Sequence, residues 1–571
     1  MLSSLDLMRF STALPGRRAH RVAGTVFSAT LALAALLLAA LPRAGHAQTD
    51  GAARSAEAAH MVVDADAAQD TISRHLYGHF AEHLGRDIYG GFWVQRGEGS
   101  SGEGAGTATD PPEGPPGGWK YNEDVIEALR AIDIPNVRWP GGCFADYYHW
   151  KDGIGPRADR PSMVNANWGG VVEDNTFGTH EFMELVERLD AEPFVVGNVG
   201  SGTVEEMADW TEYLTAEEGQ MAELRAANGH PEPWDIKYWG VGNENWICGG
   251  NMTGSYYADL YKRFATYTRH YGDGELVKVA TGPSGNRYGG HEEWTRTVLD
   301  KAAPMIDALS MHYYVFVGDP WTEDRPATEF SEQEWFEAMK DTRALDSLIT
   351  RYSDIMDEYD PEGRIGLYID EWGIWHTTRE GTPPGFLYQQ NTLRDALVAA
   401  GALDIFNQHA DRVRMANIAQ TVNVLQAMIL TRGDEMITTP TYHVFDLYKV
   451  HHDAALLPFS QAESPTYEAP SGEGSVAAIG GTASRDERGR VHVTLTNTDP
   501  NRAHEVRLDM QSADVSGVAR GRILTADAMN AHNTFGDPDA VAPRSFDGAS
   551  VGEGTVSMRM PAKSVVMLAL E

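Results

Sequence analysis

The chain has 571 residues, enough for a large hydrophobic core and more than one domain. Its apolar content of 42% indicates a globular protein rather than a disordered one. The sequence carries 46 basic and 82 acidic side chains, a net charge of −36. Because such a surface repels nucleic acid and anionic lipid, the charge argues against both as partners and favours a neutral substrate.

The first 47 residues have the composition of a secretory signal. Arginines at positions 9, 17, 18 and 21 precede an apolar run over residues 26–41, and small residues follow at 44–47. A membrane anchor is the alternative, but the run is short and a polar stretch, Gln48–Asp50, comes next. The sequence therefore predicts a signal peptide over residues 1–47 and a secreted or periplasmic protein with no membrane contact after cleavage.

Helical and strand patterns alternate along the next 400 or so residues. Residues 48–68 form an N-terminal segment with a strand at 61–65, a second strand is expected at 71–80, and the Gly- and Pro-rich stretch 96–118 is expected to be a loop. Helices are expected at residues 122–132, 179–189, 204–215, 256–270, 292–302, 333–359 and 391–404, and a last helix is expected after the strand at 413–419. Strands are expected at residues 136–139, 193–197, 277–281, 306–312, 365–369 and 413–419, and in the run before Glu244.

About eight strand–helix units over roughly 380 residues are typical of the α/β class and predict a (β/α)8 TIM barrel at residues 69–452. A doubly wound open sheet is the alternative. Against it, no Gly-rich phosphate loop follows the first strand, and polar residues recur at many strand ends. Beyond residue 452, short alternating runs predict a C-terminal all-β sandwich, jelly-roll-like, over residues 453–571, with the strand at 61–65 expected to join its sheet.

Two expected barrel strands end in a glutamate. One runs into Asn243-Glu244-Asn245-Trp246, and the strand at 365–369 runs into Asp370-Glu371-Trp372. Active sites of TIM barrels lie at the carboxyl ends of the strands. Two carboxylates in that position are the chemistry of a sugar hydrolase. The plainer interpretation is that each glutamate caps the next helix.

The remaining strand ends carry acids, amides and aromatic side chains, which bind sugar hydroxyls and stack on sugar rings. No His, Cys or carboxylate spacing indicates a metal site, so neither a metal nor another cofactor is expected. The polar and aromatic residues at these ends are His79, Glu82, Cys143, Asp146, Asn198, Asn243, His312, Tyr314 and Gln420.

The segments Trp239–Trp246 and Asp370–Trp375 resemble the acid/base and nucleophile motifs of the α-L-arabinofuranosidases of glycoside hydrolase family 51. Supporting blocks extend the resemblance from about residue 60 to the end of the chain. It implies a retaining exo-acting enzyme that releases terminal α-L-arabinofuranosyl groups from hemicellulose, pectin side chains or oligosaccharides. Glu371 is then the nucleophile and Glu244 the acid/base, with carboxyls about 5–5.5 Å apart.

The resemblance also implies a set of substrate-binding residues. One of them departs from the family pattern, because a cysteine stands at position 143 where members with Pro-Gly-Gly-Asn have an asparagine. Cys143 and Cys248, the only cysteines, lie on the same face of the expected barrel, and either a disulfide or two free buried thiols fits the sequence. The expected substrate-binding residues are Glu82, Cys143, Asn243, Trp246, Tyr314, Trp375 and Gln420.

Other functions fit the same sequence. Relatives in the family also cleave β-xylosides or β-glucans, and a furanose and a xylopyranose can present similar hydroxyls to one pocket. A non-catalytic carbohydrate-binding protein is a further alternative. The family also implies a homo-oligomer.

Overall fold

A computed structural model describes residues 58–95, 118–285, 291–320, 322–512 and 515–571. The expected signal peptide lies outside these residues, as does nearly all of the expected loop at 96–118. Among the helices of the described ranges, none combines the length and apolar character that a membrane crossing needs.

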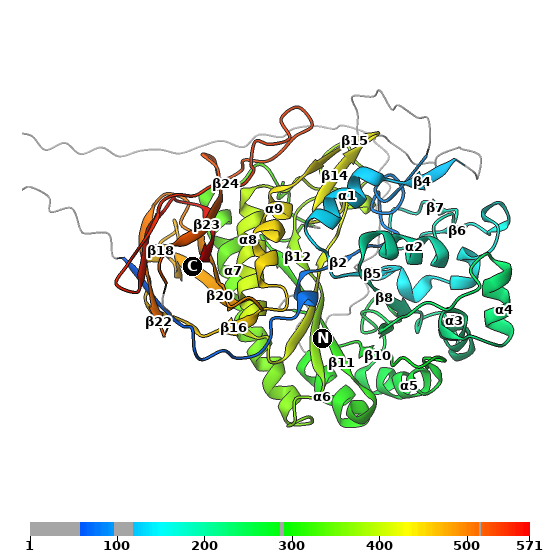
Figure 1. Cartoon of the computed structure of the whole chain (residues 1–571). Coiled ribbons are helices and arrows are strands. Elements are labelled where there is room, and N and C mark those ends of the chain that lie inside the picture. Colours follow the sequence, from blue (N-terminus) through cyan, green and yellow to red (C-terminus); the bar gives the residue numbers. More distant parts are fainter. Residues whose placement is uncertain (1–57, 96–117, 286–290, 321, 513–514) are drawn as a thin grey trace, which may run out of the picture. The chain divides into compact units, whose positions relative to one another are not determined.

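Eight parallel strands close into a barrel, which confirms the predicted TIM barrel (Figure 1). Going around it, each strand pairs with the next one in the chain, and the last pairs with the first. Their carboxyl ends therefore meet at one rim. The barrel strands are β2 (Gly78–Phe80), β5 (Asn136–Trp139), β8 (Glu192–Gly197), β9 (Tyr238–Val241), β10 (Val277–Ala280), β11 (Ala308–Phe316), β12 (Gly366–Trp375) and β13 (Val413–Ala419).

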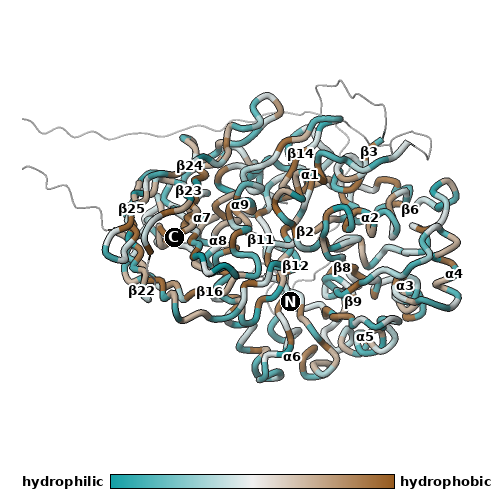
Figure 2. The backbone as a smooth tube through the Cα atoms, in the orientation of Figure 1, coloured by the Kyte–Doolittle hydropathy of each residue, from teal (hydrophilic) through white to brown (hydrophobic). Residues whose placement is uncertain are grey.

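The helices between the strands follow the predicted pattern, with one addition, α4 (Gln220–Ala227). The longest, α7, begins with a capping box in which Ser331 and Glu334 satisfy each other's backbone N–H groups. Its buried residues, among them Trp335, Met339, Thr342, Leu345 and Ile349, recur every three or four positions. Figure 2 shows hydrophobic and hydrophilic residues interspersed along the backbone. Helix α7 spans Glu332–Asp357. The others are α1 (Glu123–Ala131), α2 (Thr179–Leu189), α3 (Val204–Thr215), α5 (Gly254–Tyr267), α6 (His291–Ala302), α8 (Leu393–Gln408) and α9 (Pro440–Tyr448).

The first barrel strand is shorter than expected. The Ser73 side chain caps a 3₁₀ turn at Arg74–Tyr77, so strand β2 begins only at Gly78. A side chain at Gly78 would meet the Asn136 side chain at 2.6 Å, which explains the glycine at this close approach. In contrast, β11 and β12 pair well past their predicted ends, so both enter the rim as strands.

Two antiparallel-rich sheets form the C-terminal strand-rich domain, as predicted. Strand β1 (Ala59–Asp64) joins the first sheet, parallel to β22 (His504–Gln511) and antiparallel to β17 (Phe459–Glu463). The first sheet has the order β17-β1-β22-β26-β25 and the second β16-β20-β21-β27-β23-β24. The exact domain boundaries stay a prediction. The other strands of these sheets are β16 (Ala455–Leu457), β20 (Ile479–Arg485), β21 (Val491–Asn497), β23 (Val518–Thr525), β24 (Arg544–Ser545), β25 (Ala549–Gly552), β26 (Thr555–Met560) and β27 (Ser564–Leu570).

Candidate active site

Glu371 lies on β12 at the rim of the barrel, held by one side chain from β5 and two from the adjacent strand β11. Arg138 on β5 donates from Nη1 to its Oε1 at 2.9 Å, and the Tyr314 hydroxyl on β11 donates to Oε2 at 3.1 Å. His312 Nδ1 lies 3.3 Å from the same Oε2. These contacts hold both oxygens of the Glu371 carboxylate in place.

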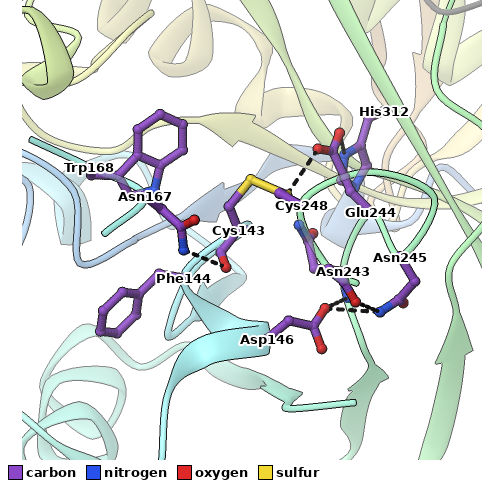
Figure 3. Close-up of a disulfide and its surroundings, with 12 residues drawn as sticks. Cys143, Phe144, Asp146, Asn167, Trp168, Asn243, Glu244, Asn245, Cys248 and His312 are labelled. Atoms are coloured by element: carbon purple, nitrogen blue, oxygen red, sulfur yellow. Dashed lines mark hydrogen bonds and ion pairs between the residues drawn. A yellow bond between two sulfur atoms is a disulfide. The ribbon is translucent and has the colours of Figure 1, made fainter. Parts of the chain in front are cut away.

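Glu244 faces Glu371 across His312. Nδ1 of His312 lies 2.9 Å from Glu244 Oε1, and Nε2 lies 3.4 Å from Asp370 Oδ1. Carboxylate oxygens of the two glutamates and a ring nitrogen of His312 all lie within 4.8 Å of one another. Figure 3 shows His312 against the Glu244 carboxylate. The two strand-end glutamates are therefore neighbours in space.

Burial and neighbouring charges shift the pKa values of the titratable side chains at the rim. Burial opposes protonation of His312, but Glu371, Asp370 and Glu244 outweigh it and raise the pKa of His312 to about 10. Burial raises the pKa of Glu371, and His312 and Arg138 counter that rise. Burial also raises the pKa of Tyr314 well above its usual value, so its hydroxyl stays protonated and keeps donating to Glu371. Two cations, His312 and Arg138, thus stabilise the ionised form of the Glu371 carboxyl.

A tight turn after β9 aims Glu244 at the rim. Its φ of 42° lies in the left-handed region, which costs a residue with a Cβ about 1–2 kcal/mol. Asp146 stabilises the turn by accepting bonds from the backbone N–H of Asn243 at 2.7 Å and from Nδ2 of Asn245 at 3.1 Å. A side chain at Gly249 would meet the Asn243 carbonyl oxygen at 1.9 Å, so only glycine fits there.

Glu82 forms a second, fully buried carboxylate site beside the first. Its Oε1 accepts bonds from the backbone N–H groups of Gly142 and Phe144 and from Trp168 Nε1, at 3.0, 3.2 and 2.8 Å. Its Oε2 accepts from Gln420 Nε2 at 2.8 Å. Burial, together with Glu371, raises the pKa of Glu82 to about 7 despite these donors.

Two amide atoms at the rim have no hydrogen-bond partner among the residues that the structure describes. These are Nδ2 of Asn243 and Oε1 of Gln420, both buried. Asn243 uses its other atom, Oδ1, to accept from Arg138 Nη2 at 2.6 Å. Because buried polar atoms are rarely left unpaired, this donor and this acceptor are suited to a ligand hydroxyl.

The expected aromatic residues divide between two places. Trp375 lies edge-on to Tyr314 with ring centroids 5.1 Å apart, so it belongs to the rim around Glu371. Trp246 instead donates from Nε1 to the Gly282 carbonyl and packs on His291 at 4.5 Å. Trp375 is thus beside the carboxylates, whereas the contacts of Trp246 place it against the segment after β10.

Cys143 and Cys248 form a disulfide, which resolves the two alternatives left by the sequence. No cysteine is free. The sulfur of Cys248 lies 3.6 Å from Oε2 of Glu244 (Figure 3). Cys143 therefore reaches the site as half of a cross-link between the β5 and β9 loops, not as a thiol.

The spacing of Glu244, His312 and Glu371 would also suit metal ligands. In the structure Nδ1 of His312 is instead engaged with the carboxylates of Glu244 and Glu371, at 2.9 and 3.3 Å. The two cysteines offer no thiolate while they are joined. The expectation that the protein uses no metal and no cofactor stays a prediction.

The sequence placed His312 and Asp146 at strand ends without assigning either a role in the site, and it assigned no site role to Arg138 or Trp168. Arg138 stands in the middle of a strand, and Trp168 lies in a loop between short strands, so neither shows its partners in the sequence. His312 and Asp146 do stand at strand ends, and that position was the signal for them.

Paired glutamates at the strand ends of a TIM barrel define a glycoside hydrolase. Two family models match this chain, the α-L-arabinofuranosidase 1 domain over residues 128–319 and the α-L-arabinofuranosidase C-terminal domain over residues 370–564. The intracellular exo-α-L-arabinofuranosidase of Bacteroides ovatus is 45% identical, over 90% of this chain and 96% of that relative. The intracellular exo-α-(1→5)-L-arabinofuranosidase of Bifidobacterium longum is 29% identical, over 91% of this chain and 93% of that relative.

Solved structures agree. The crystal structure of the family 51 arabinofuranosidase from Xanthomonas axonopodis pv. citri is 46% identical to this chain, with a TM-score of 0.83. The match covers 90% of this chain and 100% of that one. The chain belongs to the α-L-arabinofuranosidases of glycoside hydrolase family 51.

The expected location was wrong. The relatives from Bacteroides ovatus and Bifidobacterium longum are named intracellular, which contradicts a secreted or periplasmic protein. The prediction rested on basic residues before an apolar run, within residues 1–47. This pattern of charge and hydropathy is short and general, and does not by itself determine the compartment.

Proposed function

We propose that this protein is a retaining exo-α-L-arabinofuranosidase in which Glu371 is the nucleophile and Glu244 the acid/base. The observation that carries the proposal is the 4.8 Å limit on the separation of their carboxylate oxygens around His312. Retaining glycosidases place the two carboxyls about 5–5.5 Å apart, whereas inverting ones leave about 6.5–9.5 Å for a water.

In the first step Glu371 attacks the anomeric carbon while Glu244 gives a proton to the leaving oxygen. Arg138 and Tyr314 hold Glu371 by its two oxygens, leaving the attack direction fixed. In the second step Glu244 takes a proton from water, which displaces Glu371 from the sugar. Sugar hydroxyls are assigned to Glu82, Asn243 Nδ2 and Gln420 Oε1.

The substrate is proposed to be a terminal α-L-arabinofuranosyl group on hemicellulose, pectin side chains or oligosaccharides. The relatives from Bacteroides ovatus and Bifidobacterium longum are both named exo-acting arabinofuranosidases, which supports this choice. The ring of Trp375 beside Tyr314 offers a flat face at the rim for the sugar or its neighbour. A homo-oligomeric state stays a prediction.

The test compares hydrolysis of aryl α-L-arabinofuranoside, β-D-xyloside and β-D-glucoside by the wild type, Glu371→Ala and Glu244→Ala. We expect strong preference for the arabinofuranoside, and loss of at least about a thousandfold in kcat in Glu371→Ala. NMR of the first product should show the same anomer as the substrate. Azide, as an external nucleophile, should restore turnover of an activated substrate in Glu244→Ala and give a glycosyl azide.

Other outcomes would revise the proposal in different ways. Preference for a xyloside or glucoside would keep the mechanism and change the substrate. Inversion at the anomeric carbon would rule out the assigned roles. Sugar binding without turnover in the folded wild type would point to a carbohydrate-binding protein.

A further inference from the structure

The Cys143–Cys248 disulfide joins two loops that are 105 residues apart in sequence. Cys143 follows β5 and Cys248 follows β9, so the bond spans the rim between non-adjacent strands. A sulfur atom in a disulfide has no proton to donate, so the 3.6 Å approach of Cys248 Sγ to Glu244 Oε2 is a packing contact. That contact limits where the Glu244 carboxylate can lie (Figure 3).

The other end of the disulfide is tied to Glu82. The residues on both sides of Cys143, Gly142 and Phe144, donate their backbone N–H groups to Glu82 Oε1 at 3.0 and 3.2 Å. The Cys143 carbonyl in turn accepts from Asn167 Nδ2 at 3.1 Å. The backbone at Cys143 is therefore held in place by hydrogen bonds. Because the disulfide links it to Cys248, it also restrains the segment that carries Glu244.

Hydrogen bonds to Asp146 hold the other end of the segment that carries Glu244. Asp146 accepts bonds from Asn243 N and from Asn245 Nδ2, at the base of the turn. The disulfide is attached at Cys248, beside the Glu244 carboxylate. If the disulfide is broken, Asp146 still holds the base of the turn, but the contact next to the carboxylate is no longer fixed. We therefore expect the loss of the disulfide to affect the position of the Glu244 carboxylate without unfolding the turn.

Both cysteines are only partly buried, so a small thiol can reach the bond. We propose that the Cys143–Cys248 disulfide is a positioning element for the Glu244 carboxylate, and that thiol reductants reversibly weaken proton donation to the leaving group. The proposal rests on the acid/base role proposed above for Glu244.

The redox step needs a reductant with thiol groups. A first thiolate attacks one cysteine sulfur, forming a mixed disulfide and releasing the other cysteine as a thiolate, which takes a proton. A second thiol displaces the first cysteine sulfur. In total, two thiols give two electrons and two protons, leaving Cys143 and Cys248 as thiols and the reductant as its own disulfide.

The test uses leaving groups of different acidity, because only a poor leaving group needs the acid. We compare kcat/KM for phenyl and 2,4-dinitrophenyl α-L-arabinofuranoside, since this ratio of constants reports the first chemical step. After treatment with dithiothreitol we expect about a tenfold or larger loss on the phenyl substrate, and less than about a twofold loss on the dinitrophenyl substrate. Reoxidation with oxidised glutathione should restore the activity.

Two variants accompany the reduced wild type. Cys143→Ser/Cys248→Ser should show the same selective loss without reductant and no further response to dithiothreitol. Glu244→Ala is the reference for complete loss of the acid and should show the same selectivity to a larger degree. Thiol titration counts the reduced cysteines, and circular dichroism at 25 °C checks that each protein is folded.

The outcomes separate the two proposals. Selective loss in Glu244→Ala but equal loss on both substrates, or no loss, in folded reduced enzyme and in the double serine variant overturns the positioning role alone. No selectivity in Glu244→Ala overturns the acid role of Glu244 and the positioning role with it. A disulfide that stays intact in excess dithiothreitol overturns the thiol sensitivity.

Discussion

Tyr313 and Tyr314 are neighbours on β11 with different partners. The Tyr314 hydroxyl donates to Glu371 Oε2 at 3.1 Å, while the Tyr313 hydroxyl donates to the Asp341 carbonyl on α7 at 2.6 Å. Successive side chains of a strand point to opposite faces. Tyr314 therefore contacts the site, whereas Tyr313 contacts the surrounding helix α7.

Tyr314→Phe should lower kcat/KM by about 10- to 100-fold, because a hydrogen bond to a charged group is worth about 1.5–3 kcal/mol. Steady-state kinetics on an aryl α-L-arabinofuranoside measures the effect. Tyr313→Phe is the matched control and should keep the wild-type kcat/KM within about twofold. Equal losses in both variants would contradict the assigned role of Tyr314.

For individual residues, the sequence predicted well which side chains reach the rim of the barrel. It predicted less well which of them bond to each other. Tyr314 bonds directly to Glu371, and Asn243 is joined to it through Arg138. Gln420 bonds to Glu82, whose pKa is raised in part by Glu371. The role of Arg138 could not be predicted, because its partners stand in the turn after β9 and on β12, far along the chain. The functional roles themselves stay proposals.

The first turn of α2 shows how charge stabilises a single element. Glu181 accepts the backbone N–H of Gly178 at 3.0 Å, and it pairs with Arg157 and Arg160 at 2.9 and 3.0 Å. Burial opposes ionisation of Glu181, but the two arginines outweigh it and lower its pKa below 4.5. A lowered folded-state pKa contributes stability above the unfolded pKa, and this contribution is lost as the pH falls through the folded value.

Glu181→Gln should therefore lower the melting temperature at pH 7, because it leaves the buried Arg160 unpaired at a cost of about 3–5 kcal/mol. The difference from wild type should shrink in acid, as the wild-type carboxyl takes up its proton. Glu184→Gln, on the same helix, removes a half-exposed partner of Arg188 and should change stability by less than about 1 kcal/mol. A difference for Glu181→Gln that is constant from pH 7 to pH 3 would contradict this account.

Element boundaries were predictable where local signals determine them. α2 and α3 lie at Thr179–Leu189 and Val204–Thr215, the ranges that their apolar spacing predicts. The ends of β11 and β12 were not predictable, because their last residues stay in strand conformation by pairing with each other.

Asp404 connects the barrel helix α8 with the C-terminal sheets. Its carboxylate accepts bonds from Tyr448 and from Thr482 on β20, each at 3.0 Å. Burial raises the pKa of Asp404 to about 7, with Arg343 opposing the rise. A raised folded-state pKa contributes stability that is fully present below about pH 4 and is lost as the pH rises through 7.

Asp404→Asn should therefore gain melting temperature relative to wild type as the pH rises from 5 to 8, since the amide cannot ionise. Thermal melts of both proteins across this range measure the difference. Asp411→Asn, at an exposed position just after α8, is the control and should follow the wild type at each pH. A pH-independent difference between Asp404→Asn and wild type would show that the Asp404 carboxyl has the same pKa in the folded and unfolded protein, and would contradict the raised pKa.

The sequence by itself determined the alternation of helices and strands, the strand-rich C-terminal part, and the two glutamates at strand ends, because hydropathy period and strand-end position are local properties. The tertiary structure decided which strand ends meet, and hence that His312 lies between Glu244 and Glu371 and that Cys143 is bonded to Cys248. It also gave Trp246 and Trp375 different ring neighbours, His291 for the first and Tyr314 for the second. Such contacts depend on closure of the barrel, which brings together residues that are as far as 105 positions apart and that no local pattern relates.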